Sequence, residues 1–370
     1  MVSFSYAGFH TVKESAGDFS TLEAAMEDAG LANGDTIEIS GAWTAAENTA
    51  IATNHSSLYV YATGAALHSG REWTTGETGF RHRYTSNGTG DSFTLTEAGG
   101  AHKFEGLDIQ RVSASGAVSA EVFDVDAAAG ATGYTWINCI LGFNAVRDQQ
   151  DIVYDSTPVG AKTFYFENCI FYSVDRGVLD IYADAGAGLK VEFNSCTAYD
   201  VNYDGLEDRA GLFGISANTN TMTVNVFNTI AGIAAGINAC VICFTSADDN
   251  DVSMNLDRNI TNVGDLSVVR GPAEDTDTDN IVEATFSVAT DATVQMLDIT
   301  IGPFDLHLTD DATNNIAQEA HSDGTGVSQT MPTTDIDGDT RATVYDIGAD
   351  FIVPAGAPDQ PSTRRRIVMR

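Results

Sequence analysis

Apolar and polar residues alternate over short runs in this chain, and the runs recur at a nearly constant spacing. The clearest run is YFENCI at residues 165–170. Copies read WINCI at 136–140, FNSCT at 193–197 and VFNTI at 226–230, with looser versions FEGLD at 104–108 and LDRNI at 256–260. The positions equivalent to Cys169 are 107, 139, 169, 196, 229 and 259, separated by 32, 30, 27, 33 and 30 residues. A self-similar period near 30 residues is typical of a solenoid.

Each repeat contains a second apolar run upstream of the motif, with small polar turns between. The second runs include VFDV at 122–125, VLDI at 178–181, LFGI at 212–215 and VICF at 241–244. Short, alternating, β-branched and aromatic runs predict strands and exclude helical repeats. We therefore predict an all-β, right-handed parallel β-helix of about eight to ten coils, the hand following the crossover rule. Equivalent residues should stack, giving an Asn ladder (Asn138, Asn168) and a Cys ladder (Cys139, Cys169, Cys196).

Both ends of the chain differ from the repeats. Residues 1–34 contain the one convincing helix, with Ser20 at the N-cap, Glu23 at the third helical position, and an apolar stripe of Leu22, Ala25, Met26 and Ala29. Such a helix suits an N-terminal cap, since the first coil of a solenoid otherwise exposes a bare edge. The expected segments are a cap at 1–34, the β-helix at 35–310, a closing segment at 311–353 and a basic tail at 354–370. Strands at 284–288 and 294–299 are expected to continue the coils.

Phrases at the two ends resemble right-handed parallel β-helix proteins of the pectate-lyase-like superfamily. GDFSTLEAA at 17–25 with GDTIEI at 34–39 resembles their usual entry. DLHL at 305–308 with NIA at 315–317, and DIDGDTR at 335–341 with DIGAD at 346–350, resemble their usual ending. The resemblance implies the fold and a broad range of roles: lyases, hydrolases, esterases, adhesins, phage tailspikes and other virion parts. Phage members are commonly trimeric, so the resemblance also implies a homotrimer or other homo-oligomer.

The charge excludes one class of partner. The chain has 52 acidic and 18 basic residues, a net charge of −34, so phosphates would be repelled and nucleic-acid binding is not expected. Such a charge also suits a salty environment, where screening relieves self-repulsion. No apolar run reaches transmembrane length, and no secretory leader is recognisable, so we expect no membrane insertion and folding in a cytoplasm. The odd cysteine count predicts buried thiols, and Cys240 and Cys243 should lie on opposite faces of one strand.

The loops that follow the motif copies carry stacked charges. Their members are Arg147, Asp148, Asp175, Arg176, Asp204, Glu207, Asp208 and Arg209. Paired carboxylates beside an arginine are what glycoside or uronate chemistry needs, so Asp175, Asp204 and Arg176 are the catalytic candidates. Arg147, Asp148 and Arg209 join them as binding candidates. A solvated salt-bridge network explains the same pattern without any chemistry.

Two further groups are candidates for ion binding. Asp335, Asp337 and Asp339 resemble a calcium loop in composition but lack its spacing, and an alternative is that Arg341 pairs with Asp337 or Asp346. No other cofactor is expected. His82 stands between two arginines and either binds an anion or occupies a surface turn.

We expect a structural virion protein: a capsid decoration, head fibre or tailspike-like β-helix, assembled in the host cytoplasm and acting in particle assembly or host-surface attachment. The basic tail (Arg364, Arg365, Arg366) would dock on a neighbouring virion subunit, and a host-surface glycan is a further expected partner. The alternative is a polysaccharide-acting lyase or hydrolase, or a secreted, extracellular surface adhesin, on the same fold.

Overall fold

The fold was obtained as a computed structural model of the whole chain. It describes residues 8–53, 55–68, 79–86, 90–95, 100–113, 121–125, 132–144, 151–155, 161–174, 176–181, 188–201, 212–215, 221–233, 239–244, 252–262, 265–270, 273–278, 286–287, 294–298, 305–308, 332–337 and 348–349.

Three sheets form the body of the protein. The ten-stranded sheet contains β1 (Phe9–Val12), β2 (Asp35–Ile39), β4 (Leu58–Ala62), β7 (Ala101–Glu105), β10 (Thr132–Ile137), β13 (Lys162–Glu167), β16 (Leu189–Asn194), β19 (Met222–Phe227), β22 (Val252–Asp257) and β25 (Ala273–Thr278). The seven-stranded sheet contains β5 (Arg81–Ser86), β8 (Asp108–Ser113), β11 (Ile140–Asn144), β14 (Ile170–Val174), β17 (Thr197–Val201), β20 (Ile230–Ile233) and β23 (Ile260–Thr261). The eight-stranded sheet contains β3 (Ile51–Thr53), β6 (Phe93–Leu95), β9 (Phe123–Asp124), β12 (Val153–Asp155), β15 (Leu179–Ile181), β18 (Phe213–Ile215), β21 (Ala239–Phe244) and β24 (Asp265–Arg270).

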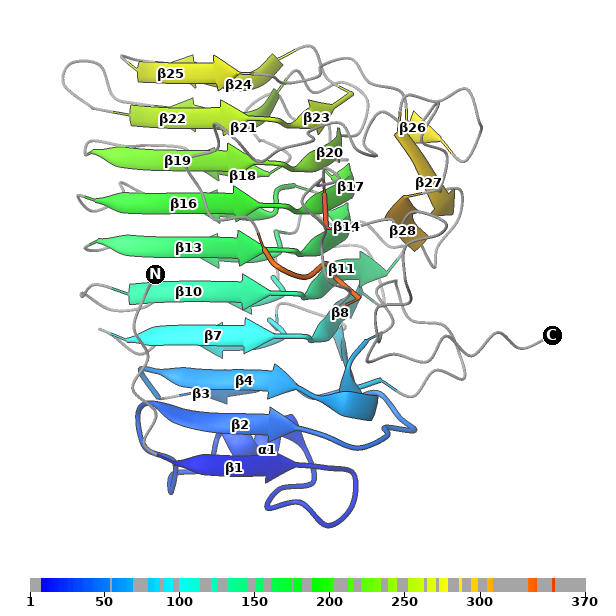
Figure 1. Cartoon of the computed structure of the whole chain (residues 1–370). Helices are drawn as coiled ribbons and strands as arrows, with labels where there is room; N and C mark the ends of the chain where they lie inside the picture. Colours follow the sequence, from blue (N-terminus) through cyan, green and yellow to red (C-terminus); the bar gives the residue numbers. More distant parts are fainter. Residues whose placement is uncertain are drawn as a thin grey trace.

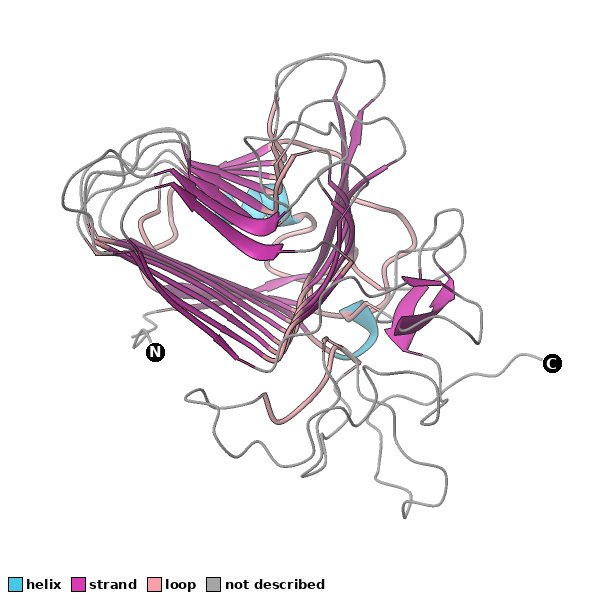
Figure 2. Ribbon diagram, turned by 90° about the horizontal axis from the view of Figure 1, so that it is seen from above, coloured by secondary structure: helices cyan, strands magenta, loops and turns pink. Residues whose placement is uncertain are grey.

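The chain visits these sheets in turn, and each strand pairs in parallel with its equivalent one coil away (Figure 1). Seen from above, the strands superimpose on the sides of a hollow-looking prism whose interior the side chains fill (Figure 2). The protein is therefore an all-β parallel solenoid, as the 30-residue period predicts. The pairings Trp136 with Phe166, and Phe166 with Phe193, confirm the alignment of the motif copies residue by residue.

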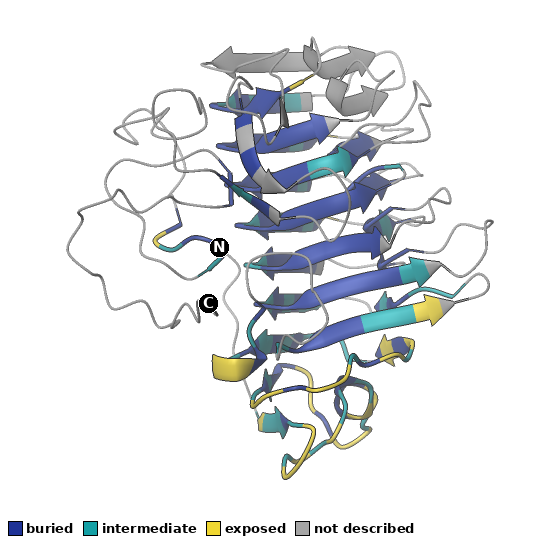
Figure 3. Ribbon diagram, turned by 90° about the vertical axis from the view of Figure 1, so that its right-hand side faces the viewer, coloured by how far each residue is buried: buried dark blue, intermediate teal, exposed yellow. Residues whose placement is uncertain are grey.

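Stacked side chains build the core. The ring centroids of Trp136 and Phe166 lie 4.7 Å apart, as do those of Phe166 and Phe193, and the rings of each pair are stacked nearly parallel. All three residues are fully buried. Truncating one such aromatic to alanine typically removes about 3–5 kcal/mol of stability. Figure 3 shows this burial running through the stacked strands, while exposed residues gather in the first coils.

The predicted Asn ladder is confirmed, and the structure gives its cause. In the six coils from β7 to β22, the motif residue after the strand of the ten-stranded sheet has a left-handed backbone, with φ of 71° at Gly106, 51° at Asn138, 52° at Asn168, 54° at Ser195, 51° at Asn228 and 58° at Arg258. Asn and Gly tolerate this conformation better than other residues do. This left-handed residue turns the chain sharply from one sheet into the next.

The Cys ladder is also confirmed. Cys139, Cys169 and Cys196 are free and buried, and their thiols lie 3.6, 3.4 and 3.5 Å from the carbonyl oxygens of Phe104, Trp136 and Phe166 in the preceding coil. Burial and the neighbouring thiols raise the pKa of Cys169 well above its usual value. The strand predicted to carry Cys240 and Cys243 forms as β21, but their side chains lie outside the described set, so their placement on opposite faces stays a prediction.

The N-terminal helix is shorter than predicted. α1 spans Leu22–Met26, and its N-cap is Thr21, whose hydroxyl accepts the N–H of Ala24. Ser20 is therefore not the cap. The buried carboxylate of Glu47 accepts the N–H groups of Leu22 and Glu23 at 2.8 and 2.7 Å, so tertiary structure satisfies the donors that the predicted capping box would have used.

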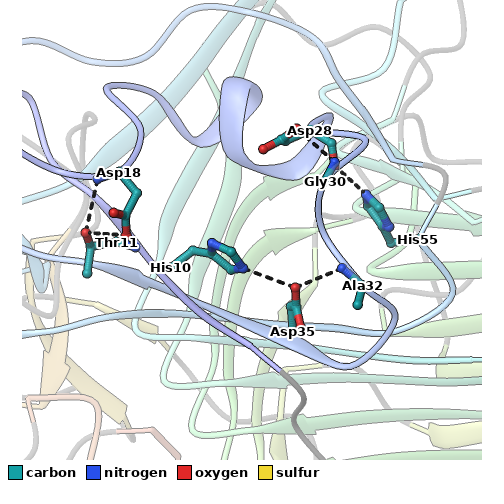
Figure 4. Close-up of polar contacts among 8 residues, drawn as sticks. All are labelled: His10, Thr11, Asp18, Asp28, Gly30, Ala32, Asp35 and His55. Carbon is teal, nitrogen blue, oxygen red and sulfur yellow. Dashed lines mark hydrogen bonds and ion pairs between the residues drawn. The ribbon is translucent and has the colours of Figure 1, made fainter.

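Polar contacts fasten the coil around this helix (Figure 4). Asp35 Oδ2 accepts the N–H of Ala32 at 2.8 Å and lies 3.1 Å from His10 Nε2. Asp18 Oδ2 accepts the backbone N–H and the hydroxyl of Thr11 at 2.8 and 3.0 Å. The His10–Asp35 contact joins β1 to β2, and the other contacts fix the loops on either side of the helix.

His82 lies in β5 rather than in a surface turn, so both alternatives offered for it are wrong. The side chain is fully buried, and Nε2 donates to the carbonyl of Thr49 at 2.8 Å. Burial lowers its pKa to about 4, so the ring is neutral and cannot attract an anion.

The strands expected to extend the coils near residues 284–299 exist but pair differently. β26 (Phe286–Ser287), β27 (Val294–Asp298) and β28 (Asp305–Leu308) form a separate three-stranded sheet with an antiparallel β27–β28 pair. This sheet and the C-terminal segment, which we define as residues 332–337 and 348–349, share a second hydrophobic cluster with the outer side of the seven-stranded sheet. The cluster contains Ile140, Ile170, Tyr172, Ile230, Ile260, Val294, Met296, Leu306, Leu308, Ile336 and Ala349.

The physical reason is the apolar outer side of the seven-stranded sheet. A further coil would have left Ile140, Ile170 and Ile230 in water, whereas folding back covers them. Backbone hydrogen bonds fix the return, from Gly348 N to Asn228 O and from Ile336 N to Ala349 O, both 2.9 Å.

Candidate functional site

A pocket opens beside the turn between the ten-stranded and seven-stranded sheets, in the coils of β4, β7 and β10. Its volume is about 410 Å³. We call it the tyrosine pocket, and its lining residues include Tyr59, Tyr61, Leu67, His68, Glu105 and Asp337. Concave sites with aromatic walls and a few polar groups are where proteins usually bind small molecules.

Strand alternation explains the tyrosines. Leu58, Val60 and Ala62 of β4 are buried in the core, so Tyr59 and Tyr61 project from the outer face of the ten-stranded sheet. Their rings stack with centroids 4.9 Å apart and an interplanar angle of 25°. The two rings therefore cover one face of each other, and the pair forms an aromatic part of the pocket wall.

Carboxylates hold both tyrosine hydroxyls. Tyr59 donates to Oε2 of Glu105 at 2.5 Å, and Tyr61 donates to Oε2 of Glu38 at 3.0 Å. Burial and the Glu38 carboxylate raise the pKa of Tyr61 to about 12, so its hydroxyl stays protonated. Lys103 completes the group: its ammonium lies 2.8 Å from Glu105 and 4.4 Å from the centre of the Tyr59 ring.

The pocket floor is formed by the column of left-handed turn residues that we call the turn column, here Gly106 and Asn138. Nε2 of the buried His68 donates to the carbonyl oxygen of Asn138 at 2.6 Å. Gly106 has a φ of 71°, and a Cβ there would approach Leu67 Cδ2 to 2.7 Å, so a side chain at 106 would press on the pocket lining. Glycine at this copy of the motif, where the later copies have Asn, Ser or Arg, leaves the floor open.

The remaining wall comes from the C-terminal segment. Ile336 and Asp337 line the pocket, and Ile336 is buried in the second hydrophobic cluster. Oδ2 of Asp337 lies 2.9 Å from Nε2 of His307, and its backbone N–H donates to Oδ1 of Asp335 at 3.0 Å. Asn168 Nδ2 also donates to the carbonyl of Thr334. These contacts place a second carboxylate, Asp337, in the pocket that Glu105 lines.

Polar side chains continue along the outer face of the ten-stranded sheet beyond the pocket. Tyr165 donates to Glu167, and burial raises the pKa values of both groups. Further along, Glu192 lies 3.1 Å from the ammonium of Lys190 and accepts from Asn225 Nδ2 at 3.2 Å. The face is thus a row of hydrogen-bonding groups with an excess of carboxylates.

Most site residues predicted from the loops lie outside the described residues: Arg147, Asp148, Asp175, Asp204, Glu207, Asp208 and Arg209, together with Asp339, Arg341 and the tail arginines 364–366. Arg176 is described and half-buried, beside Gly177, whose N–H donates to Asp151 Oδ1 at 2.9 Å. The proposed charged ladder therefore stays a prediction. Asp335 and Asp337 are brought together, and their described contacts are to protein groups.

Calcium at these aspartates stays a prediction. Within the described ranges, no three His, Cys, Asp or Glu side chains are grouped so as to hold a metal ion. The same part of the chain contains no helix long and apolar enough to cross a membrane.

Sequence reasoning missed the tyrosine pocket. It treated Glu105-Gly106 as part of a motif copy and gave neither these residues nor Tyr59 and Tyr61 a binding role. One signal was present: two outward tyrosines on one strand, at positions where a solvated sheet face usually carries small polar residues.

Comparison with family models and with curated proteins finds no match for this chain. Among solved structures, it is similar to the crystal structure of pectate lyase Pel9A. The sequences are 14% identical, the alignment covers 94% of this chain and 96% of that one, and the TM-score is 0.36. At that score the likeness adds nothing to the strand pairing, which by itself establishes the parallel β-solenoid.

Proposed function

We propose that this protein binds a glycan in the tyrosine pocket. The observation that carries the proposal is the stacked pair of Tyr59 and Tyr61 beside Glu105 and Asp337 in one pocket of about 410 Å³. The C–H groups of a sugar ring pack well against aromatic side chains, and the tyrosines supply such contacts in the pocket wall. Its hydroxyls donate hydrogen bonds, and carboxylates are strong acceptors. The pocket offers both kinds of contact within one concave site.

The biological setting that we propose is attachment to a host surface by a virion protein of the capsid-decoration, head-fibre or tailspike-like kind. A stiff solenoid with a lateral glycan site suits such attachment. A secreted adhesin would use the same site in the same way. Immunogold labelling of purified particles with an antibody to this chain would distinguish the two, since an adhesin would be absent from particles.

A polysaccharide lyase or hydrolase is the second candidate, because Glu105 and Asp337 line the same pocket. Glycoside hydrolysis uses two carboxyl groups flanking the scissile bond. Release of reducing ends from a bound glycan, abolished by Glu105→Gln, would establish this activity. Binding without release would leave attachment as the function.

Replacing Tyr59 and Tyr61 by alanine tests the proposal. Because the aromatic surface is lost while β4 stays in its sheet, affinity for a bound glycan should fall at least about tenfold, or 1.4 kcal/mol. Tyr84→Ala in β5, on a different sheet, is the matched control and should bind like the parent protein. Equal binding by all variants, or no glycan binding by the parent chain on a broad oligosaccharide array, would refute the proposal.

A further inference from the structure

We infer that the glycan recognised by the tyrosine pocket carries no acidic groups: it is built from neutral or amino sugars rather than uronic, sialic, sulfated or phosphorylated ones. This inference rests on the proposed function and concerns the chemistry of its ligand. It follows from which charges line the pocket and from what already neutralises the basic group beside them.

The pocket itself is negative. Glu105 and Asp337 line it, and Glu38 holds the hydroxyl of Tyr61 at its edge. The ammonium of Lys103 is 2.8 Å from Glu105 and packs on the Tyr59 ring. Its charge therefore balances one carboxylate rather than adding a cationic site for an anionic sugar.

The acidic character continues along the outer face of the ten-stranded sheet, where a longer chain would extend. Glu38, Glu105, Glu167 and Glu192 project there, against Lys103 and Lys190. Lys190 is paired with Glu192 at 3.1 Å. A polyanionic chain on this face would place like charges opposite one another, which weakens association.

Hydrogen-bonding capacity points the same way. A carboxylate has about four lone-pair sites and no donor, so the outer face has more acceptor than donor capacity. Glu105 accepts from Tyr59 and Lys103 and, being partly exposed, retains further lone pairs for a ligand. Sugar hydroxyls and ammonium groups supply donors to such a surface, whereas sugar carboxylates bring only more acceptors.

The net charge of −34 acts at longer range. It repels an approaching polyanion and attracts a polycation, and salt screens both effects. The inference therefore predicts how affinity depends on salt. The affinity for amino-sugar oligomers falls as the salt concentration rises, while the affinity for neutral oligomers does not change.

An oligosaccharide array containing neutral, amino and acidic glycans tests this, with the full chain as probe at low and high salt. We expect neutral or amino glycans to dominate the binders and oligogalacturonates and sialosides to bind at least about tenfold more weakly. Binders that are mainly acidic would overturn this inference while leaving glycan binding intact. An array without binders would refute both the proposed function and this inference.

A charge variant sharpens the test. Glu105→Gln with Asp337→Asn keeps the size of both side chains, and should lower affinity for neutral binders severalfold while narrowing their advantage over acidic glycans. Glu23→Gln, in the N-terminal helix and away from the pocket, is the matched control and should change neither. An unchanged ratio of neutral to acidic binding in the double variant would contradict the role given to these carboxylates.

Discussion

The ammonium nitrogen of Lys162 lies 2.6 Å from Oδ2 of Asp155, and both side chains are fully buried. Asp155 ends β12 in the eight-stranded sheet, and Lys162 begins β13 in the ten-stranded sheet. The pair therefore ties two sheets together inside the solenoid. A buried charge is tolerated only when it is paired, so each residue depends on the other.

Lys162→Met should destabilise the protein by about 3–5 kcal/mol, because it leaves the Asp155 carboxylate buried without its ammonium partner. Urea unfolding followed by circular dichroism measures the loss. Lys190→Met is the matched control: its side chain is 45% exposed and its pair with Glu192 should contribute only about 0–1 kcal/mol. Combining Lys162→Met with Asp155→Leu should recover much of the lost stability, and equal effects of the two single substitutions would contradict this account.

A second prediction concerns Glu121, which lies just before β9 of the eight-stranded sheet. Burial, followed by its hydrogen bond with Asp91, raises its pKa from 4.5 to about 9. The folded state therefore holds a proton that the unfolded state releases above about pH 4.5. The stability this group contributes is complete below about pH 4.5 and is lost as the pH rises toward 9.

Glu121→Gln should remove this dependence, because its amide keeps a hydrogen-bonding group without the titration. We expect the free energy of unfolding of the parent protein to fall between pH 5 and 9, by at most about 1.4 kcal/mol per pH unit from this group. Thermal unfolding at a series of pH values measures this fall. The variant should show a flatter profile and higher stability at the alkaline end. Glu23→Gln provides the matched change of charge outside this site, and parallel profiles for all three proteins would rule the prediction out.

The coils could be predicted from the sequence because equivalent residues meet equivalent environments. Asn138 and Asn168 occupy the same left-handed turn one coil apart, and Cys139 and Cys169 contact the same carbonyl position of the coil before. Repetition made these roles visible without any structure. The helix cap was missed because Ser20 and Thr21 have similar capping ability, and the carboxylate of Glu47, over twenty residues away, contributes to that end of the helix.

The tyrosine pocket could not be predicted because its parts are distant in sequence and follow no repeat. His68 and Asn138, which form a hydrogen bond, are 70 residues apart in the sequence, and Asn168 and Thr334 are 166 residues apart. The site needs one coil where the turn residue is glycine and a C-terminal segment that returns along the solenoid. Both conditions depend on tertiary contacts that local patterns do not encode.

Asn228 allows the turn column to be tested directly. Its φ is 51°, and Nδ2 donates to the hydroxyl of Ser195 at 3.1 Å. Asn228→Val should cost about 2–3 kcal/mol, since a β-branched residue strains this backbone and the hydrogen bond is lost. Asn228→Gly should cost less, because glycine adopts positive φ freely. Urea unfolding ranks the variants, and a valine variant as stable as the glycine variant would show that the backbone is not the controlling factor.

The last prediction joins the C-terminal segment to binding. His307 lies on β28, and Nε2 is 2.9 Å from Oδ2 of Asp337, the carboxylate that lines the tyrosine pocket. His307→Ala removes this contact and loosens the pocket wall without touching the stacked tyrosines. Glycan affinity should fall severalfold, and proteolytic cleavage within 332–337 should become faster, while the main unfolding transition of the solenoid stays in place.

His55→Ala, which removes a histidine contact to Asp28 near the N-terminal helix, is the matched control and should leave glycan affinity unchanged. If His307→Ala accelerates cleavage but binds glycan like the parent protein, Asp337 contributes to closing the fold and not to recognition.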